Sequence, residues 1–228
     1  MTNRLLWADK RLQYQFSDSK LLDLALTHRS AAKHNNERLE FLGDAFLNFS
    51  IAQELYEIRP DDSEGDLSRL RASLVKGTTL AELGRELEIA PLIVMGAGEL
   101  RSGGSNRDST IANAVEAVIG AVLLDGGAKA ADSCVTRLFE SRLKNLPSAD
   151  SLKDAKTKLQ EWLQGRGLGL PIYEVESVTG EPHQQCFVVS CELRDSGQRT
   201  TGHGQSRRHA EQDAAERMHS ELNSDGKK

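Results

Sequence analysis

Residues 36–44, with the sequence Asn36-Glu37-Arg38-Leu39-Glu40-Phe41-Leu42-Gly43-Asp44, place three carboxylates in a segment that is otherwise rich in large apolar side chains. In a helix of about 3.6 residues per turn, Glu37, Glu40 and Asp44 fall on one face. The neighbouring leucines and phenylalanines predict that the inner edge of this face lies against a hydrophobic core. Because isolated ionised carboxylates are costly to desolvate, the face either points into solvent or binds a metal ion.

A second predicted helix, residues 110–124, favours the metal site. Its side chains are almost all apolar, and its interior polar positions are Asn113 and Glu116, about one turn apart. A helix that is apolar on nearly all sides is buried, so Glu116 has no easy route to water. Gly43 and Gly120 would allow the two predicted helices to approach each other closely.

Packing of these two helices would gather their polar side chains into one oxygen-rich cluster. The predicted members of the cluster are Glu40, Asp44, Asn113 and Glu116. Ligand sets made only of oxygen suit a hard cation, Mg²⁺ or Mn²⁺. We therefore predict a metal site in which the three carboxylates are the ligands and the asparagine is a weaker, neutral one.

The chain resembles the bacterial ribonuclease III family over almost its whole length. Residues 36–44 are similar to the family's signature helix, and residues 64–72 are similar to its next acidic helix. Residues 98–104 and the helix over 111–120 complete the pattern of the catalytic domain. The resemblance implies a homodimeric endonuclease that uses Mg²⁺, which Mn²⁺ can replace, to cleave double-stranded RNA.

Further roles are implied by the resemblance alone. Glu37 and Glu64 would serve as auxiliary acids near the RNA or a second ion. The two catalytic domains would pair through the signature helix, with Phe41 packed against the partner subunit. The paired sites would cut both strands and leave 5′-phosphates and short 3′ overhangs, as in the processing of ribosomal and other structured RNA precursors. The family usually has aspartate where this chain has Asn113.

The organisation of the chain fits this picture. We predict an all-α catalytic domain over residues 1–146, a linker over 147–152, a small α+β domain over 153–222 and a disordered tail over 223–228. In the third segment the hydrophobic period changes from helical to alternating and back, in the order α-β-β-β-α. The predicted elements are a helix at 154–164, strands at 173–176, 185–193 and 199–201, and a helix at 210–222. Together they resemble a double-stranded-RNA-binding domain.

The last helix begins with two cations, Arg207 and Arg208, followed by His209. Cations are unfavourable at a helix N-terminus because the helix dipole is positive there. A bound phosphate would resolve the conflict, since free backbone N–H groups and both arginines would point at it. The alternative is a solvated basic turn. The family usually has lysine where His209 stands, so a third phosphate contact is expected to be weaker or pH-dependent.

Two further segments resemble RNA contacts of the family. On the helix at 154–164, Thr157, Gln160 and Glu161 share a polar face whose acceptor groups could meet ribose 2′-hydroxyls in the minor groove. Residues 180–183 are similar to the turn that enters a neighbouring minor groove, with His183 at its tip.

The charge balance argues for a small electrostatic footprint. The chain has 29 Lys and Arg against 34 Asp and Glu, a net charge of −5, so the generally basic surface of many nucleic-acid-binding proteins is missing. Binding must rest on a local patch and on shape, and we expect modest affinity that salt weakens strongly. The expected patch consists of Lys153, Lys156, Arg207 and Arg208.

Composition and termini indicate an ordinary cytoplasmic protein. The 228 residues can bury a substantial core, and we expect no membrane span and no signal peptide. Cys134, Cys186 and Cys191 are odd in number and lack metal-type spacing, which predicts reduced thiols.

Two rival hypotheses belong to other functional classes. One is a non-catalytic double-stranded-RNA-binding protein with an inert acidic cluster, and Asn113 is its best support. The other is a carboxylate-bridged helical metalloprotein that carries out redox chemistry. Such bundles use Glu-x-x-His pairs, whereas Glu40 and Glu116 are followed three residues later by Gly43 and Ile119. The second rival is therefore disfavoured.

Overall fold

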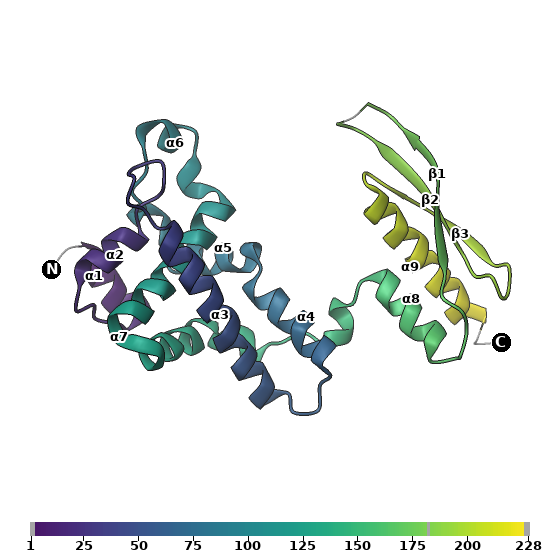
Figure 1. Cartoon of the computed structure of the whole chain (residues 1–228), viewed down its shortest axis with the longest axis horizontal. Helices are drawn as coiled ribbons and strands as arrows, with labels where there is room; N and C mark the ends of the chain where they lie inside the picture. The colour runs from purple at the N-terminus through teal and green to yellow at the C-terminus, as the bar shows by residue number, and fades with distance from the viewer. Residues whose placement is uncertain (1–2, 182, 226–228) are drawn as a thin grey trace. The chain divides into compact units, whose positions relative to one another are not determined.

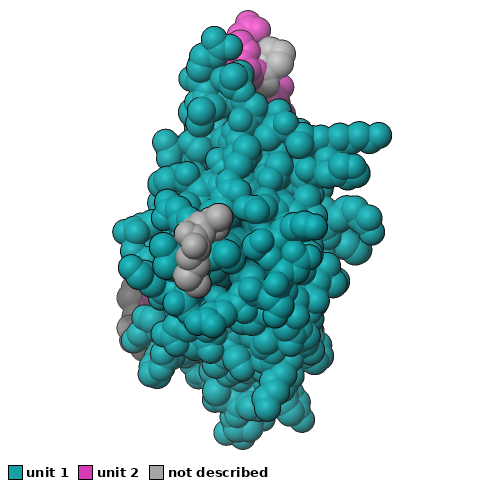
Figure 2. Space-filling view, turned by 90° about the vertical axis from the view of Figure 1, so that its left-hand side faces the viewer, with its two compact units in different colours: residues 1–152 teal, residues 153–228 magenta. Residues whose placement is uncertain are grey.

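The computed structural model describes residues 3–181 and 183–225. The chain divides into two compact units, residues 1–152 and 153–228, which are drawn in separate colours in Figure 2. The first unit is helical, and the second contains a three-stranded sheet and two helices (Figure 1). The predicted fold class, an all-α domain followed by an α+β domain, is confirmed.

The first unit is built from seven α-helices joined by short turns, counted over the described residues. These helices are α1 (Asn3–Trp7), α2 (Ser19–Ala25), α3 (Glu37–Ile58), α4 (Glu64–Val75), α5 (Gly77–Glu86), α6 (Ala97–Arg101) and α7 (Asp108–Lys144). The break between α4 and α5 falls at Lys76, whose ψ of 148° is extended, directly before Gly77. Gly84 lies buried inside α5, where a Cβ would stand only 2.3 Å from Ile111 Cγ2.

Helices α3 and α7 form the central pair of this unit (Figure 1). Their backbones meet at two glycines, because a Cβ on Gly43 would lie 1.8 Å from the carbonyl oxygen of Glu116 and one on Gly120 would lie 2.2 Å from that of Leu39. The predicted close approach through these glycines is confirmed. Helix α7 is kinked at Gly127, whose φ of 76° and ψ of 178° interrupt the helical backbone.

The length and apolar character of α7 differ from one expectation drawn from the sequence. The sequence was expected to contain no segment apolar enough to span a bilayer, but α7 is long and apolar enough by length and composition. More than half of its most apolar window is buried within the protein. It packs against α2, α3 and α5, so its apolar character is accounted for by its place in the core.

The second unit places two helices on one face of an antiparallel sheet of order β1-β2-β3 (Figure 1). Its small core includes Leu159, Leu163 and Met218. Three alanines of the last helix, Ala210, Ala214 and Ala215, are all fully buried. The elements are α8 (Ala155–Gln164), β1 (Ile172–Thr179), β2 (Cys186–Glu192), β3 (Arg199–Gly204) and α9 (Arg207–Asp225).

Two segment boundaries differ from expectation. Within the predicted linker, Ala149–Leu152 forms a 3₁₀ turn, and both Ala149 and Leu152 pack against the core of the first unit. Helix α9 continues to Asp225, three residues into the predicted tail, and residues 226–228 lie outside the described part. The three cysteines are free thiols, with Cys186 exposed and the other two buried.

Candidate metal centre and RNA-binding surface

The crossing of α3 and α7 brings the predicted cluster together. Helix α3 supplies Glu40 and Asp44, and helix α7 supplies Asn113 and Glu116. The Asn113 side chain hydrogen-bonds to the Glu40 carboxylate, and the charges of Glu40 and Asp44 both act on Glu116. The four oxygen-bearing side chains therefore lie near the crossing, where Gly43 removes the bulk that would keep the helices apart.

The environment of the cluster disfavours negative charge. Burial, reinforced by the nearby charges of Asp44 and Glu40, raises the pKa of Glu116 to about 7. Burial also raises the pKa of Glu40, although its hydrogen bond with Asn113 acts in the opposite direction. A divalent cation would reverse this effect, because it favours the ionised form of every carboxylate that it touches.

The chemistry of these side chains fits a hard cation. All four offer oxygen, the donor that Mg²⁺ and Mn²⁺ prefer in proteins. Among the described residues, no three carboxylate, imidazole or thiol groups already stand around one point at ligand spacing. Carboxylates of like charge repel one another, so a bound ion would have to draw these side chains together by rotation about their χ angles. Asp44 is exposed, and its Oδ1 accepts a hydrogen bond from Asn48 at 2.9 Å.

The two predicted auxiliary acids lie in different places. Glu37 is exposed at the start of α3, and its charge contributes to the raised pKa of Glu40. Glu64 begins α4, which follows the other end of α3 (Figure 1). The end of α3 at Ile58 lies 14 residues beyond Asp44, which corresponds to about 21 Å of helix, so we do not expect Glu64 to adjoin the cluster of its own chain. Its carboxylate instead accepts a hydrogen bond from Ser68 at 2.8 Å.

A pocket of about 290 Å³ adjoins the cluster and contains residues that sequence reasoning missed. Glu37, Glu40 and Asn113 line it together with further residues of the first turn of α7, the residue before α3 and the segment after α2. These residues are His28, Arg29, Asn36, Ser109 and Thr110. His28 and Arg29 precede the signature helix in a segment without helical periodicity. They are held there by pairing of Thr27 with Val94, a long-range contact that no local pattern signals.

In the second unit, the start of α9 presents the predicted basic turn. Ser206 Oγ accepts a hydrogen bond from the backbone N–H of His209 at 3.2 Å, which caps the helix. Arg207, Arg208 and His209 are exposed on this first turn. Arg207 also forms an ion pair with Glu211, at 2.8 Å between Nε and Oε1.

The cations of the expected patch are partly paired with acids of the same domain. Lys156 Nζ lies 2.7 Å from Glu211 Oε2 and 4.2 Å from the centre of the Tyr173 ring. Lys153 Nζ lies 2.5 Å from Glu161 Oε2. Glu211 also pairs with Arg207, so one carboxylate serves two of the expected cations. Within the expected patch, Lys153, Lys156 and Arg207 each have an acidic neighbour inside the domain, which reduces the net positive charge that the patch offers to phosphates.

The other two predicted RNA contacts lie on α8 and in the β1–β2 turn. On α8, Gln160 and Glu161 are exposed and Thr157 is half-buried; its backbone N–H donates to the Asp154 cap at 2.8 Å. The turn begins at Gly180, whose φ of 92° favours glycine, and it leaves His183 exposed.

Comparison with known proteins agrees with both units. A family model described as ribonuclease-III-like matches residues 18–143, and one for the double-stranded RNA binding motif matches residues 155–222. Ribonuclease 3 of Nitrosococcus oceani is 54% identical over 219 residues, which cover 95% of this chain and 94% of the relative. Ribonuclease 3 of Vibrio atlanticus is 52% identical over 208 residues, covering 91% and 92% of the two chains.

Solved structures resemble the first unit. The nuclease domain of ribonuclease III from Campylobacter jejuni superposes with a TM-score of 0.61 at 38% identity, covering 64% of this chain and all of that domain. The helical arrangement, the matched models and the full-length relatives agree with one another. This chain belongs to the ribonuclease III family, in which a ribonuclease domain is joined here to a double-stranded-RNA-binding domain.

Proposed function

We propose that this protein is a cytoplasmic, homodimeric, Mg²⁺-dependent endonuclease that cuts double-stranded RNA and leaves 5′-phosphates and short 3′ overhangs. Ribosomal and other structured RNA precursors are the proposed substrates. The observation that carries the proposal is the carboxylate cluster at the α3–α7 crossing, where burial raises the pKa of both Glu40 and Glu116. A fold that holds acids in such surroundings is suited to bind a cation there.

Each side chain of the cluster has a proposed task. Glu40, Asp44 and Glu116 would hold Mg²⁺, or Mn²⁺ in its place, and Asn113 would add a neutral oxygen. When bound, the ion supplies an activated water and stabilises charge on the scissile phosphate and the leaving oxygen. The Asn113 amide, which lowers the pKa of the neighbouring Glu40 carboxyl, would help to orient that ligand. Glu37, on the rim of the adjoining pocket, would act near the RNA.

The substrate class can be tested with matched nucleic acids of one sequence. In Mg²⁺, the full chain should cleave an RNA duplex into fragments with 5′-phosphates, and it should leave the single-stranded RNA and the DNA duplex intact. End-labelling of the products before and after phosphatase treatment identifies the ends. Equal cleavage of all three substrates, or products with 3′-phosphates, would contradict the proposal.

A non-catalytic RNA-binding protein is the second candidate, and the observation that favours it is Asn113. An asparagine removes one negative charge from a cluster in which aspartate is usual. Hard cations bind more tightly as ligand charge increases. The three carboxylates that remain are sufficient, in our proposal, for a working site with a higher metal requirement.

Asn113→Asp is accordingly expected to increase cleavage at low Mg²⁺ and to change it little at high Mg²⁺. The aspartate adds a charge to the site, so the concentration of Mg²⁺ for half-maximal single-turnover cleavage should fall by about tenfold, the order expected for a gain of roughly 1.4 kcal/mol in ion binding. Coincident titration curves would place residue 113 outside the ligand set. Absence of cleavage in both forms would favour the RNA-binding candidate.

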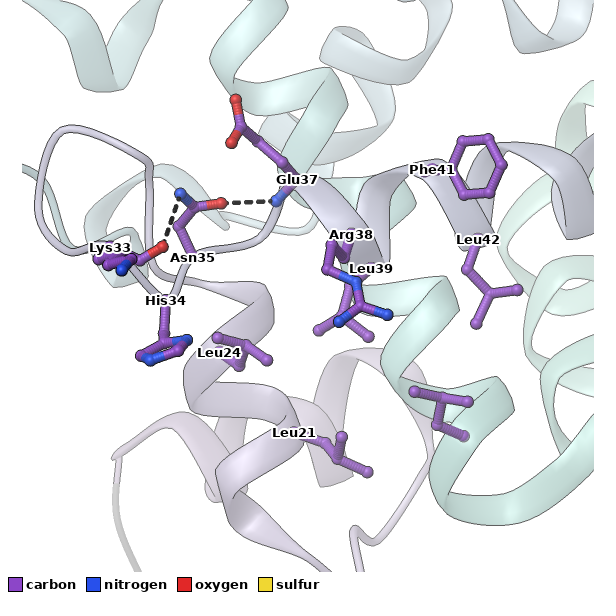
Figure 3. A pocket seen from close by; sticks show the side chains of 11 residues that line it. Leu21, Leu24, Lys33, His34, Asn35, Glu37, Arg38, Leu39, Phe41 and Leu42 are labelled. Atoms are coloured by element: carbon purple, nitrogen blue, oxygen red, sulfur yellow. Dashed lines mark hydrogen bonds between the residues drawn. The ribbon is translucent and has the colours of Figure 1, made fainter.

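The proposed dimer rests on an exposed aromatic side chain beside an apolar pocket. Phe41 is 78% exposed on α3. Beside it lies a pocket of about 850 Å³ lined by leucines of α2, α3 and α7 (Figure 3). A two-fold axis gives both partners the same surface, so Phe41 of each copy could fill the pocket of the other. The leucines that line the pocket are Leu21, Leu24, Leu39, Leu42 and Leu124.

Phe41→Asp is expected to convert the dimer into monomers. A charge in an apolar contact would have to be desolvated without a partner, and the dissociation constant should rise by at least about a hundredfold, the order expected for loss of an aromatic anchor. Sedimentation velocity measures the change. Leu100→Asp is the matched control, because Leu100 is also exposed, at 56%, but lies on α6. Dimers of unchanged stability in Phe41→Asp would refute the proposed interface.

In the second unit we propose that Thr157, Gln160 and Glu161 meet ribose hydroxyls, that His183 enters a neighbouring minor groove and that the start of α9 binds phosphate. Each of these segments is positioned by a backbone feature of the fold, a cap or a tight turn. His209 would add a weaker contact beside the two arginines. The proposal predicts shape-selective binding with little dependence on sequence.

The double variant Arg207→Ala, Arg208→Ala should weaken duplex binding for all sequences. Each lost phosphate contact reduces the slope of log affinity against log salt by about 1, so a decrease of about 2 is expected. Fluorescence anisotropy at several salt concentrations provides the slope. Arg194→Ala, in the exposed β2–β3 turn, should leave it unchanged. An unaltered slope in the double variant would mean that these arginines are ordinary surface cations.

A further inference from the structure

The pocket beside the carboxylate cluster contains two chemically different sets of groups. Glu37 and Glu40 are acids, whereas His28, Arg29 and Ser109 offer hydrogen-bond donors. Carboxylates repel the phosphates of RNA unless a metal ion lies between them, and the proposed ion can contact only the phosphate next to it. The neighbouring phosphates of the same strand need donors of another kind.

Hydrogen bonds fix the tautomer of His28. The backbone N–H of Ser30 lies 3.2 Å from His28 Nδ1 and can only donate to it. Ser30 Oγ lies 2.8 Å from the same nitrogen and accepts the N–H of Gly96 at 3.0 Å. The hydroxyl proton is therefore free to point at Nδ1. Because Nδ1 accepts, the hydrogen of the neutral ring resides on Nε2.

The segment that carries His28 is rigidly attached to the rest of the unit. The backbone N–H of His28 donates to the carbonyl of Val94 at 2.9 Å, and the N–H of Asn36 donates to the carbonyl of Thr27 at 2.9 Å. These bonds join the segment to the residues before α6 and to the start of α3. Within the described residues, Nε2 of His28 has no hydrogen-bond partner, so a fixed ring presents an unused donor.

Arg29 adds a cation at the same place. Its side chain is 72% exposed, and Nη1 lies 3.6 Å from Glu37 Oε1. Its charge also acts on Glu40, so the guanidinium lies within electrostatic reach of the cluster. An exposed ion pair at this distance is weak, whereas guanidinium groups bind phosphate oxygens in a two-pronged manner. Exchange of Glu37 for a phosphate would therefore be favourable.

We propose that His28 and Arg29 form a phosphate-binding subsite for RNA, which holds the phosphodiester group next to the one that is cut. His28 donates from Nε2, and Arg29 donates from its guanidinium. The subsite fixes the position of the strand relative to the carboxylate cluster, and in this respect it rests on the proposed function. It is separate from the phosphate contacts proposed for α9.

Two substitutions of His28 distinguish the proposed Nε2 donor from the hydrogen bond that Nδ1 accepts from the Ser30 N–H. The amide of His28→Asn can replace Nδ1 as acceptor for the Ser30 N–H but has no group at Nε2. The longer amide of His28→Gln can place an N–H near the position of Nε2. Because a hydrogen bond to a charged group is stronger than one between neutral groups, single-turnover cleavage of an RNA duplex with excess enzyme should be slowed at least about tenfold in His28→Asn. Cleavage by His28→Gln should be closer to that of the parent.

Arg29→Ala tests the subsite through the affinity for an RNA duplex, without any cleavage. The salt slope of duplex affinity, measured with Ca²⁺ in place of Mg²⁺, should decrease by about 1 for one lost phosphate contact, while Arg29→Lys should retain most of the slope. This measurement needs no cleavage. If the parent chain fails to cut RNA, the proposed function fails, but the binding result still supports or refutes the subsite.

The outcomes that overturn the subsite are specific. Cleavage by His28→Asn at the parental rate would exclude a role for the Nε2 donor. Equal impairment of both His28 variants, accompanied by equal decreases in melting temperature, would assign His28 a purely structural role. An unchanged salt slope in Arg29→Ala would exclude the phosphate contact.

Discussion

Glu116→Gln is expected to abolish RNA cleavage while duplex binding stays within a few-fold of the parent. The amide has nearly the same shape as the carboxylate but removes one of the three charges that the proposed site offers to the ion. The single-turnover rate should fall by about a thousandfold or more, at the upper end of what loss of one key electrostatic group costs. Binding should persist because the RNA contacts proposed for α8, the β1–β2 turn and α9 are unaltered.

The same variant should change the pH dependence of stability in the metal-free protein. The pKa of Glu116 is raised in the fold from an ordinary 4.5 to about 7, so the fold favours the protonated acid. Stability that this group contributes below pH 4.5 is lost as the pH rises through 7. In chelator, Glu116→Gln should therefore melt at a higher temperature than the parent at pH 8, and the difference should shrink near pH 5.

Thermal melts in chelator at the two pH values, paired with cleavage assays in Mg²⁺, measure both effects. Glu57→Gln is the matched control, since Glu57 is an exposed acid near the far end of α3, and it should change neither result. Parental cleavage by Glu116→Gln would remove Glu116 from the ligand set. A stability difference that is the same at pH 5 and pH 8 would contradict the raised pKa.

Gly43→Ala is expected to have the largest effect on folding. The new Cβ would lie 1.8 Å from the carbonyl oxygen of Glu116, and a backbone atom cannot yield as a flexible side chain can. Overpacking of this kind should cost about 3 kcal/mol or more. Separation of α3 from α7 should also spread the cluster and abolish cleavage.

Urea denaturation reports the stability of the Gly43 variant. Gly77→Ala is the control, because a Cβ at Gly77 meets no atom within 4 Å among the described residues, and alanine favours helix over glycine. Its stability should equal or exceed that of the parent. If Gly43→Ala unfolds at the same urea concentration as the parent, the close helix crossing is not required by the fold.

The centre of the site could be predicted from sequence because its determinants are local. Periodicity defined the two helices, and the acidic residues within them had few other ways to be satisfied. Gly43 and Gly120 then indicated where the helices meet, and the close contact at both positions agrees. Composition and spacing were sufficient because the cluster depends on only two elements.

The parts of the site that could not be predicted from the sequence depend on contacts between residues far apart in the chain. His28 enters the pocket because residues 27–30 are pinned to residues 94–96, which no helical or strand period reveals. The pairing of Lys156 with Glu211, which is 55 residues away, likewise has no local pattern that could reveal it. Glu64 resembles a catalytic acid of the family, yet the length of α3 beyond Asp44 means that we do not expect it beside the cluster of its own chain.

The most direct test of the central claim is a Mg²⁺ titration of single-turnover cleavage, carried out on an RNA duplex with the parent chain and Glu116→Gln at pH 8. The account predicts no cleavage by the parent in chelator, a saturable increase in rate with Mg²⁺, and restoration of activity when Mg²⁺ or Mn²⁺ is returned to the chelated protein. Glu116→Gln should remain inactive at concentrations that saturate the parent. Cleavage by the parent that proceeds equally in chelator and in Mg²⁺ would contradict the assignment of the α3–α7 carboxylates as the metal site of this ribonuclease.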